Sequence, residues 1–567
     1  MTNHAELIRQ LQDAVGAPHV LTGVRATARY RKGFRFGDGP VLAVVRPGTL
    51  VAQWRVLVAC HAAGVIVIMQ AANTGLTGGS VPDGDSYDRP IVIINGLRLA
   101  RIHVLPGAAQ VVALPGATLF QLEKTLRPLG REPHSVIGSS CLGASVTGGI
   151  ANNSGGALIR RGPAFTQLAV YARVTDAGAL ELVNHSGLKL GNDPETILAR
   201  LEAGDFRPDE IETPDGRAAS DPDYAAHVRD ISAPTPARFN ADPRRLFEAS
   251  GSAGKVAIFA LRLDTFAAET DTAVFYIGSN DANELTLIRR EILANFANLP
   301  VAGEYIHRAA FDIAVTYGKD MFLAIEKLGT DRLPFLFALK GRFDAFVSRL
   351  GFVPNDLSDR LMQLAGQCFP QHLPARMRDW RDRYEHHLLL KMSGPGIAEA
   401  RSWLAGHFPS GVGDYFECTP QEGAKAFLHR FAVAGAAIRY RAIHRDTVED
   451  IVALDVALRR DDTQWEEHLP AEVEAPILHK LYYGHFFCHV FHQDYIIAKG
   501  HDPVAIEHRM WDLLDARGAE YPAEHNVGHL YKAKPALAAH YKALDPCNCF
   551  NPGVGQTSKF ACWGEDA

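Results

Sequence analysis

Two glycine-rich segments that each follow an apolar run constrain the fold of this 567-residue chain more than any other feature. The first, 70–80 (QAANTGLTGGS), follows the apolar run 64–69 (GVIVIM), which predicts a buried parallel strand. The second, 135–156, contains GSSCLGASVTGGIANNSGG. Small residues allow positive φ angles and let main-chain N–H groups approach a ligand closely. Because successive N–H groups in such turns bind anions, the pair of segments predicts one long, doubly phosphorylated ligand held between them.

The alternative is that both segments are ordinary turns in a glycine-rich chain, and either segment alone leaves that alternative open. Neither matches the dinucleotide-binding pattern GxGxxG followed by an acidic residue, nor the phosphate-binding pattern GxxxxGK[ST]. The sequence therefore disfavours a nicotinamide-dependent enzyme and a nucleotide-dependent kinase.

The N-terminal half of the chain alternates between strand and helix patterns, which indicates an α/β rhythm. The expected elements are helices at 5–16, 50–63 and 119–126 and strands at 41–46, 64–70, 91–94, 168–174 and 256–263. Residues 190–245 are polar and rich in Asp, Pro and Arg, so we expect an insertion with little core of its own.

A second module begins near residue 267 and again pairs strands with helices. The expected elements are strands at 272–278 and 385–391 and helices at 284–297 and 397–407. This pattern is compatible with an α+β cap built around an antiparallel sheet, but periodicity alone does not fix the topology.

The composition is that of a soluble globular protein, with 47% hydrophobic and 22% charged residues. A chain of this length is expected to form two or three domains. The net charge of −6 argues against a nucleic-acid-binding protein. Eight scattered cysteines and no secretory signal predict reduced thiols in the cytoplasm. No apolar run approaches the roughly 18–20 residues of a spanning helix, so membrane contact is expected only at the surface.

Several motifs resemble those of a known protein family. Residues 70–80 resemble the first pyrophosphate loop of vanillyl-alcohol-oxidase-type flavoproteins, and 133–156 resembles their second flavin-contacting segment. Over almost the whole chain, the sequence resembles the respiratory, quinone-linked D-lactate dehydrogenases of bacterial membranes. This wider similarity includes 27–35 (TARYRKGFR), 130–135 (GREPHS) and 521–529 (YPAEHNVGH).

The resemblance implies an α+β fold with a two-subdomain FAD-binding domain, a cap domain with an antiparallel sheet and a small helical membrane-binding insertion. It implies noncovalent FAD, since no flavin-linking histidine is evident around Asn73. The flavin contacts that it implies are Ala71, Ala72, Asn73, Thr74, Gly75, Gly79, Ser80, Gly138, Ser145, Gly155 and the backbone at Ile258.

The resemblance also implies how the chain is divided. The FAD-binding domain is expected to comprise 1–266 and 520–567, because the tail DPCNCFNPG resembles the family's ending and returns to this domain. The expected cap or substrate domain comprises 267–310, 386–425 and 450–519. The expected membrane-binding region comprises 311–385 and 426–449.

In the segment 311–385, basic residues such as Lys319 and Arg381 are interleaved with aromatic ones such as Phe335 and Trp380. Such a mixture suits a surface that lies on anionic lipid headgroups. The alternative is a helical insertion with its own small core and a solvated basic face, because acidic residues dilute the charge. The resemblance favours membrane contact, at the cytoplasmic face of the bacterial inner membrane.

A histidine-rich segment near the C-terminus carries the chemistry. In related flavin-dependent 2-hydroxyacid dehydrogenases, an HxGDGNxH strand supplies two histidines and a later EHG supplies a carboxylate and a base. His485 and His492 have the spacing of the first pattern with different residues between them, and Glu524 and His525 fit the second. Two imidazoles and a carboxylate suit a divalent ion such as zinc or manganese, which would bind a 2-hydroxy acid and lower its hydroxyl pKa. The alternative is that the histidines bind substrate directly or only pack.

His525 is the expected catalytic base, because oxidation of an alcohol requires removal of its hydroxyl proton and a histidine titrates near neutrality. The substrate carboxylate also requires a cation, ideally an arginine fork. Arg430 is the preferred candidate, with Arg439 and Arg308 as alternatives that the sequence does not rank firmly.

We therefore predict a peripheral membrane flavoenzyme that oxidises D-lactate to pyruvate by hydride transfer to flavin N5 and passes the electrons to membrane quinone. The preference for the D-isomer comes only from the resemblance. The main alternative is a metal-assisted FAD dehydrogenase of another D-2-hydroxy acid, such as glycolate or 2-hydroxyglutarate. A flavin-containing sensor without turnover and a binding protein without flavin are the alternatives from other classes.

Overall fold

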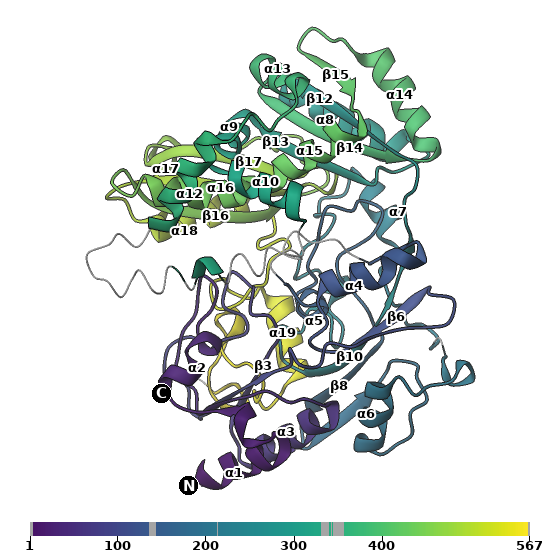
Figure 1. Cartoon of the computed structure of the whole chain (residues 1–567), viewed down its shortest axis with the longest axis vertical. Helices are drawn as coiled ribbons and strands as arrows, with labels where there is room; N and C mark the ends of the chain where they lie inside the picture. The colour runs from purple at the N-terminus through teal and green to yellow at the C-terminus, as the bar shows by residue number, and fades with distance from the viewer. Residues whose placement is uncertain are drawn as a thin grey trace.

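The computed structural model describes residues 4–134, 143–212, 214–329, 339–341, 343 and 357–564. Gly138, one of the expected flavin contacts, lies outside these residues. In Figure 1 the purple and blue N-terminal elements form one half of the molecule, and the teal and green elements form the other. The yellow C-terminal segment, which includes α19, returns to the first half and lies close to β3.

The first half opens with a four-stranded sheet of strand order β1-β2-β4-β3, in which β2, β4 and β3 run parallel. The three expected apolar strands form because their side chains are buried on both faces of the sheet, as in other parallel sheets. The elements are α1 (His4–Val15), β1 (Val20–Leu21), α2 (Val24–Arg31), β2 (Ala43–Val45), α3 (Leu50–Ala62), β3 (Ile66–Gln70) and β4 (Ile91–Asn95).

An antiparallel sheet of strand order β5-β6-β10-β8-β9 follows in the same half. Between its strands lie α4, whose Thr118 and Gln121 form a capping box, and the short α5. The elements are β5 (Ile102–Val104), β6 (Gln110–Ala113), α4 (Leu119–Leu126), β7 (Arg131–Glu132), α5 (Val146–Ala151), β8 (Ala169–Val174), β9 (Leu180–Asn184), α6 (Pro194–Ala203), α7 (Tyr224–Arg229), β10 (Ala257–Asp264) and β11 (Phe266–Ala267).

The described part of the second half is built on a seven-stranded antiparallel sheet of order β15-β12-β14-β13-β17-β18-β16, which confirms the expected α+β class. Its strands are β12 (Thr272–Ser279), β13 (Ala302–His307), β14 (His386–Ser393), β15 (Gly413–Glu417), β16 (Val448–Ala457), β17 (Ile477–His485) and β18 (Val490–Ala498). We call this sheet the cap sheet.

Helices cover both faces of the cap sheet (Figure 1). On one face Phe275, Tyr305 and Phe491 pack under α8 (Ala282–Asn295), α14 (Pro395–His407) and α18 (Pro503–Ala516). The helices on or next to the other face are α9 (Arg308–Tyr317), α10 (Lys319–Leu328), α12 (Leu357–Cys368), α15 (Pro420–Phe431) and α16 (Val433–Ile443). We call these five helices the helical cover.

The helical cover belongs to the region expected to bind membranes. It and its flanks expose several large apolar side chains, which are Leu328, Leu339, Phe343, Leu361, Leu364, Phe369 and Ile438. Among the described helices, none combines the length and the apolar character needed to cross a bilayer. The expected boundary between 425 and 426 falls inside α15, and the division of the chain into domains stays a prediction.

The last part of the chain packs against the first half of the molecule. The Cys549 carbonyl accepts from the Val67 N–H of β3, and Asn551 Nδ2 donates to the carbonyls of Gly79 and Ala253. The α19 helix (Pro535–Leu544) precedes these contacts. This is the return to the first half that the C-terminal motif predicts.

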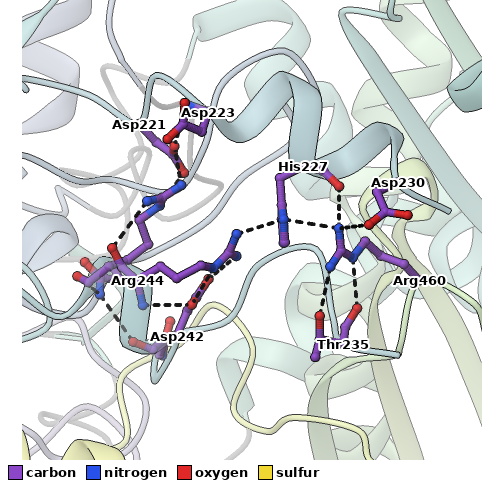
Figure 2. A network of polar contacts seen from close by, with 11 residues as sticks. Asp221, Asp223, His227, Asp230, Thr235, Asp242, Arg244 and Arg460 are labelled. Atoms are coloured by element: carbon purple, nitrogen blue, oxygen red, sulfur yellow. Dashed lines mark hydrogen bonds and ion pairs between the residues drawn. The ribbon is translucent and has the colours of Figure 1, made fainter. Parts of the chain in front are cut away.

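A polar network fixes residues 220–245, the last part of the expected insertion at 190–245, against the end of β16 (Figure 2). Arg460 donates to the carbonyls of Thr235 and His227, at 3.0 Å for the first and 2.6 Å for the second. His227 also lies 2.7 Å from Arg244, which is paired with Asp242. The segment thus packs on the rest of the molecule, and its polar sequence serves these buried contacts.

Candidate active site

The first glycine-rich loop lies at the carboxyl end of β3 and is shaped by side chains that bind its oxygen atoms. Gln70 Nε2 donates to the Ser80 carbonyl at 2.8 Å, and Asn95 Nδ2 donates to the Ala71 carbonyl at 3.0 Å. Asn73 adopts a φ of 54° and accepts from Ser80 Oγ at 3.0 Å. The loop conformation is therefore held without using its amide hydrogens.

Those amide hydrogens are available to a ligand. The N–H groups of Ala72, Asn73, Thr74 and Gly75 have no hydrogen-bond acceptor among the described residues. Unpaired main-chain donors on successive residues form a concave site that favours a phosphate oxygen. These four unpaired N–H groups make the first glycine-rich segment suited to bind a pyrophosphate group.

The second glycine-rich segment leads through α5 to Gly155. Ser145 caps α5 by accepting the Gly148 N–H at 3.0 Å, and the Thr147 hydroxyl is buried without a partner among the described residues. Ile258 lies on β10 at a register shift opposite β8, and its carbonyl accepts from Gln53 Nε2 at 3.2 Å. The expected flavin contacts other than Gly138 thus lie on the loop after β3, on the segment around α5 and on β10.

The C-terminal segment 524–529 lies between the two glycine-rich segments. A Cβ atom on Gly155 would lie 2.1 Å from Glu524 Oε1, and one on Gly79 would lie 2.5 Å from Asn526 Nδ2. Thr77 Oγ1 donates to the Asn526 carbonyl at 2.7 Å. A side chain at either glycine would therefore force Glu524 or Asn526 to move from its position.

On the cap side, Asp455 of β16 joins two of the expected histidines. Its Oδ1 lies 3.3 Å from His492 Nδ1, and its Oδ2 lies 3.3 Å from His525 Nδ1. Oδ2 also accepts the main-chain N–H groups of Glu524 and His525, at 2.6 and 2.8 Å. Asp455 is 2% exposed, so one buried carboxylate positions both rings and the main chain beside them.

A second buried chain of charges runs through His485. His485 Nδ1 lies 2.6 Å from Glu304 Oε1 of β13, and its Nε2 lies 3.2 Å from Glu524 Oε2. Glu524 Oε1 is paired with Arg238 at 2.6 Å, and Arg238 also donates to the Gly156 carbonyl. Arg238 and Glu524 are 2% and 6% exposed, so their charges compensate each other away from water.

These contacts set the pKa values of the site. Burial alone would raise the pKa of Glu524, but Arg238 and His485 outweigh it and lower that pKa to about 2. Burial alone would lower the pKa of His485, but Glu304 and Glu524 raise it to about 9. Burial alone would raise the pKa of Asp455, yet His525 and His492 lower it. For His492, burial prevails over Asp455 and lowers the pKa.

The three residues expected to bind a metal converge. One ligand atom from each of His485, His492 and Glu524 lies within 4.8 Å of the other two, and no other such group occurs among the described residues. Each of the three is also held from its far side, by Glu304, Asp455 and Arg238 in turn. Outer partners of this kind orient metal ligands, so the donor set and its surroundings fit a divalent ion.

Of the three candidate arginines, only Arg430 reaches this cluster. Arg430 Nε lies 2.7 Å from Glu304 Oε2, its guanidinium lies over the Tyr483 ring, and its Nη2 has no partner among the described residues. Arg439 is paired with Asp320 and Asp359, and Arg308 is paired with Glu385. The structure therefore separates Arg430 from the two alternatives.

Sequence reasoning missed Glu304, Asp455 and Arg238. Glu304 is the one carboxylate of β13, and Asp455 lies in the apolar second half of β16. A charged residue in such a run is a signal that could have found them, because an unpaired buried charge is costly. Arg238 carries no comparable signal in the sequence.

Arg35 belongs to a basic and aromatic cluster at 29–35 that precedes β2. Arg35 is exposed, but its charge acts on two carboxyl groups of the other half. Burial raises the pKa of Asp494 to about 6 and that of Glu507 to about 7, and Arg35 opposes both shifts. The loop therefore approaches the second half of the molecule near β18.

Comparison with known proteins connects this site to a reaction. Residues 274–563 match the family "D-lactate dehydrogenase, membrane binding", and residues 41–182 match the family "FAD binding domain". The chain is 60% identical to the quinone-dependent D-lactate dehydrogenase of Escherichia coli over 564 residues, covering 100% of this chain and 99% of the relative. It is 56% identical to the protein of the same name from Haemophilus influenzae, covering 99% of both chains.

Solved structures show the same fold at low sequence identity. The p-cresol methylhydroxylase structure with substrate bound gives a TM-score of 0.57 at 12% identity, covering 98% of this chain and 97% of that chain. An alkyldihydroxyacetonephosphate synthase structure gives a TM-score of 0.58 at 12% identity, covering 97% of this chain and 84% of that chain. These similarities concern the fold alone.

Proposed function

The chain belongs to the family of membrane-binding, quinone-dependent D-lactate dehydrogenases, and from this premise we propose which of its residues carry out the reaction. The reaction is the FAD-dependent oxidation of D-lactate, with a quinone as the electron acceptor. The alternative interpretation is an FAD dehydrogenase of another D-2-hydroxy acid, and the curated relatives named above favour D-lactate instead.

His525 acts as the base. Because its Nδ1 faces Asp455 at 3.3 Å, the carboxylate favours the tautomer with the proton on Nδ1, and Nε2 is left to accept the hydroxyl proton of lactate. The side chain is 43% exposed, so substrate and solvent can reach it. This Asp–His pair between the two glycine-rich segments is the observation that carries the proposal.

Arg430 binds the carboxylate of lactate. Arg430 and His485 are both paired with the Glu304 carboxylate, and Arg430 Nη2 has no acceptor among the described residues. An arginine N–H donated to a carboxylate is a charge-assisted hydrogen bond, which is stronger than a neutral one. The contact orients lactate with its hydroxyl group toward His525.

FAD, when bound, supplies the acceptor for the hydride that leaves Cα. The N–H groups at 72–75 would hold its pyrophosphate, and the segment around Ser145 and Gly155 would face its other side. His485, His492 and Glu524 would hold a divalent ion, which would polarise the hydroxyl and carboxylate of lactate.

The membrane-binding family match supports contact with a membrane surface. We place that contact at the helical cover, on anionic lipids at the cytoplasmic face of the inner membrane. The exposed leucines of α12, Leu361 and Leu364, are suited to enter the headgroup boundary. Nothing in the net charge of −6 suggests a nucleic-acid partner.

The role of His525 is tested by mixing the FAD-loaded enzyme with D-lactate in the absence of oxygen and following the flavin absorbance. His525→Gln should slow this bleaching at least 100-fold, since general base catalysis contributes roughly 10²–10⁴-fold, while the FAD content stays unchanged. The exposed His501→Gln is the control and should bleach at the wild-type rate. A His525→Gln rate within threefold of wild type would show that another group takes the proton.

A further inference from the structure

Three buried histidines beneath the helical cover are not used by the reaction at the flavin. His387 lies on β14, His429 on α15 and His372 just before α13 (Ala375–Arg383), and their exposed fractions are 0%, 1% and 4%. No ring nitrogen of the three has a hydrogen-bond partner of good geometry among the described residues, although the main chain at Phe311 acts on His429 as a hydrogen-bond acceptor of poorer geometry. A buried imidazole nitrogen without a partner destabilises the fold, so a ligand that pairs with it would gain that hydrogen bond.

The three imidazoles are connected by aromatic rings. The Phe322 ring lies 4.5 Å from the ring of His372, which lies 6.2 Å from that of His429. Phe311 then contacts His429 at 4.2 Å and His387 at 5.6 Å. The result is a row of five flat rings through the helical cover, in which His372 and His429 are adjacent and Phe311 separates His429 from His387.

The inner end of this row approaches the active site. His387 pairs with Ile306 across β14 and β13, Ile306 pairs with Tyr483 of β17, and Tyr483 pairs with His492 of β18. Directly paired residues point to the same face of a sheet, and adjacent strands are about 4.8 Å apart. Three such steps put His387 about 14 Å from His492, on the same face of the cap sheet.

The outer end approaches the surface. A pocket of about 480 Å³ opens between α9 and α13. Phe311 and Val315 line it together with polar and charged side chains, which include Asp312, Gln371, Arg378, Arg381 and Asp382. Phe311 thus belongs both to the pocket and to the row of rings, and His372 follows Gln371 directly in the chain. Exposed leucines on α12 lie in the same part of the fold, which suits contact with lipid.

We propose that this row of histidines is the site that binds the quinone head group. The inference rests on the proposed function and adds the location of the second substrate. A turn of the Phe311 ring would open the pocket onto His387 and His429, whose N–H groups would donate to the quinone carbonyls. Phe311 and Phe322 would pack on the flat ring of the quinone, and its apolar tail would remain in the lipid.

The chemistry balances without a further reactant. Oxidation of one D-lactate to pyruvate releases two electrons and two protons, and reduction of one quinone to the quinol takes up the same number. Each quinone carbonyl becomes a hydroxyl group, so each oxygen gains one proton. Each histidine that donates to a quinone oxygen can pass on its N–H proton while its other nitrogen takes up a proton from solvent, so the ring stays neutral.

Photolabelling tests the location directly. The FAD-loaded enzyme on lipid vesicles is illuminated with an azido derivative of a short-chain benzoquinone, digested, and analysed by mass spectrometry. We expect label on the peptides that contain His372 or His429, and its loss when unlabelled decylubiquinone is added in excess. Displaceable label confined to peptides of the first half would overturn the proposal.

Substitution tests the role of the nitrogen atoms. His429→Leu should raise the KM for decylubiquinone at least tenfold, while D-lactate still bleaches the flavin and still reduces a soluble dye at the wild-type rate. His429→Gln keeps an N–H donor and should restore the quinone KM to within threefold of wild type. The control is His386→Gln. His386 precedes His387 on β14, and its ring lies on the other face of the cap sheet, where Nδ1 is 2.8 Å from the Tyr305 hydroxyl.

The two proposals fail in different ways. If D-lactate does not bleach the wild-type flavin, the proposed function is wrong. If bleaching and dye reduction persist in His429→Leu and its quinone KM equals that of wild type, only the quinone site is wrong. Should His429→Leu fail to fold, His387→Leu is measured in the same way, and an unchanged quinone KM there also overturns the site.

Discussion

The buried pair of Arg238 and Glu524 offers a quantitative test of how the site is held together. The substitution Arg238→Met removes the guanidinium and keeps most of the apolar length of the side chain. It leaves the Glu524 carboxylate, 6% exposed, with His485 as its remaining cationic partner, and it frees the carbonyls of Gly156 and Leu158. We therefore expect loss of stability together with loss of lactate oxidation.

The magnitude follows from the pKa of Glu524. That pKa is lowered from 4.5 to about 2 in spite of burial, and a difference of this size corresponds to about 3 kcal/mol in favour of the charged form. Arg238 is the largest contributor to the lowering, and breaking one partner of a buried pair typically costs about 3–5 kcal/mol. Because the folded pKa is lowered, this stabilisation is present above about pH 4.5 and is lost as the pH falls toward 2.

The assay is thermal unfolding of the FAD-loaded protein at pH 7, followed by flavin fluorescence. A loss of about 3 kcal/mol should lower the midpoint by roughly 6–12 °C for a cooperative unit of 150–250 residues. Arg55→Met is the matched control, because Arg55 pairs with Glu195 at the same 2.6 Å but with 58% and 41% of the side chains exposed. Such an exposed pair contributes at most about 1 kcal/mol.

Two results would refute this reasoning. One is an Arg238→Met midpoint within 2 °C of that of Arg55→Met. The other is a double variant, Arg238→Met with Glu524→Gln, that is no more stable than Arg238→Met alone, because removing the uncompensated charge should recover part of the loss.

Two further predictions concern the cofactor and the membrane. Gly79→Ala should weaken FAD binding at least tenfold by fluorescence titration, because the added methyl group would lie 2.5 Å from Asn526 Nδ2, and combining it with Asn526→Ala should restore part of the affinity. Replacing Leu361 and Leu364 by glutamate should reduce sedimentation with anionic vesicles at least threefold without changing the rate of flavin bleaching by D-lactate. Unchanged FAD affinity or unchanged sedimentation would contradict these predictions.

Much of the fold could be predicted because local sequence dictates it. The helix expected at 119–126 has those bounds in the structure, since Thr118 and Gln121 cap its first turn and Gly130 ends the short turn that follows. The strand expected at 91–94 is buried on both faces and extends to Asn95. In these segments the hydrophobic periodicity and the residues at the ends of the element predict the same structure that tertiary packing stabilises.

The candidate site could be predicted only in part, because its partners are set by strand register. The spacing of His485 and His492 was visible in the sequence, but Glu304 meets His485 from a strand 181 positions earlier in the chain. Likewise Asp455 reaches His525 across 70 positions. A one-residue slip of β13 or β16 would turn these carboxylates to the other face, and no local pattern fixes that register.

The balance of charge in the site leads to a final prediction about the metal. The three buried carboxylates Glu304, Asp455 and Glu524 carry −3, while Arg238, Arg430 and the protonated His485 carry +3, which gives 0 before lactate binds.

The lactate anion would bring the total to −1 beside carboxylates that are almost fully buried, and an uncompensated buried charge is costly. If a divalent ion takes the place of the His485 proton, the ion and the two arginines outweigh the three carboxylates by one charge. The net charge of the site is then +1, and bound lactate brings it to 0. Metal binding should then release about one proton for each ion bound.

The measurement combines metal analysis with a pH indicator. Dialysis against a chelator should slow flavin bleaching by D-lactate at least tenfold, and added zinc or manganese should restore the rate. His485→Ala should contain no bound ion and release no proton on addition of metal, whereas the control His501→Ala should behave as wild type. If the dialysed enzyme holds no metal and keeps its full rate, His485 retains its proton, and the three residues bind lactate directly, as the other interpretation of the sequence holds.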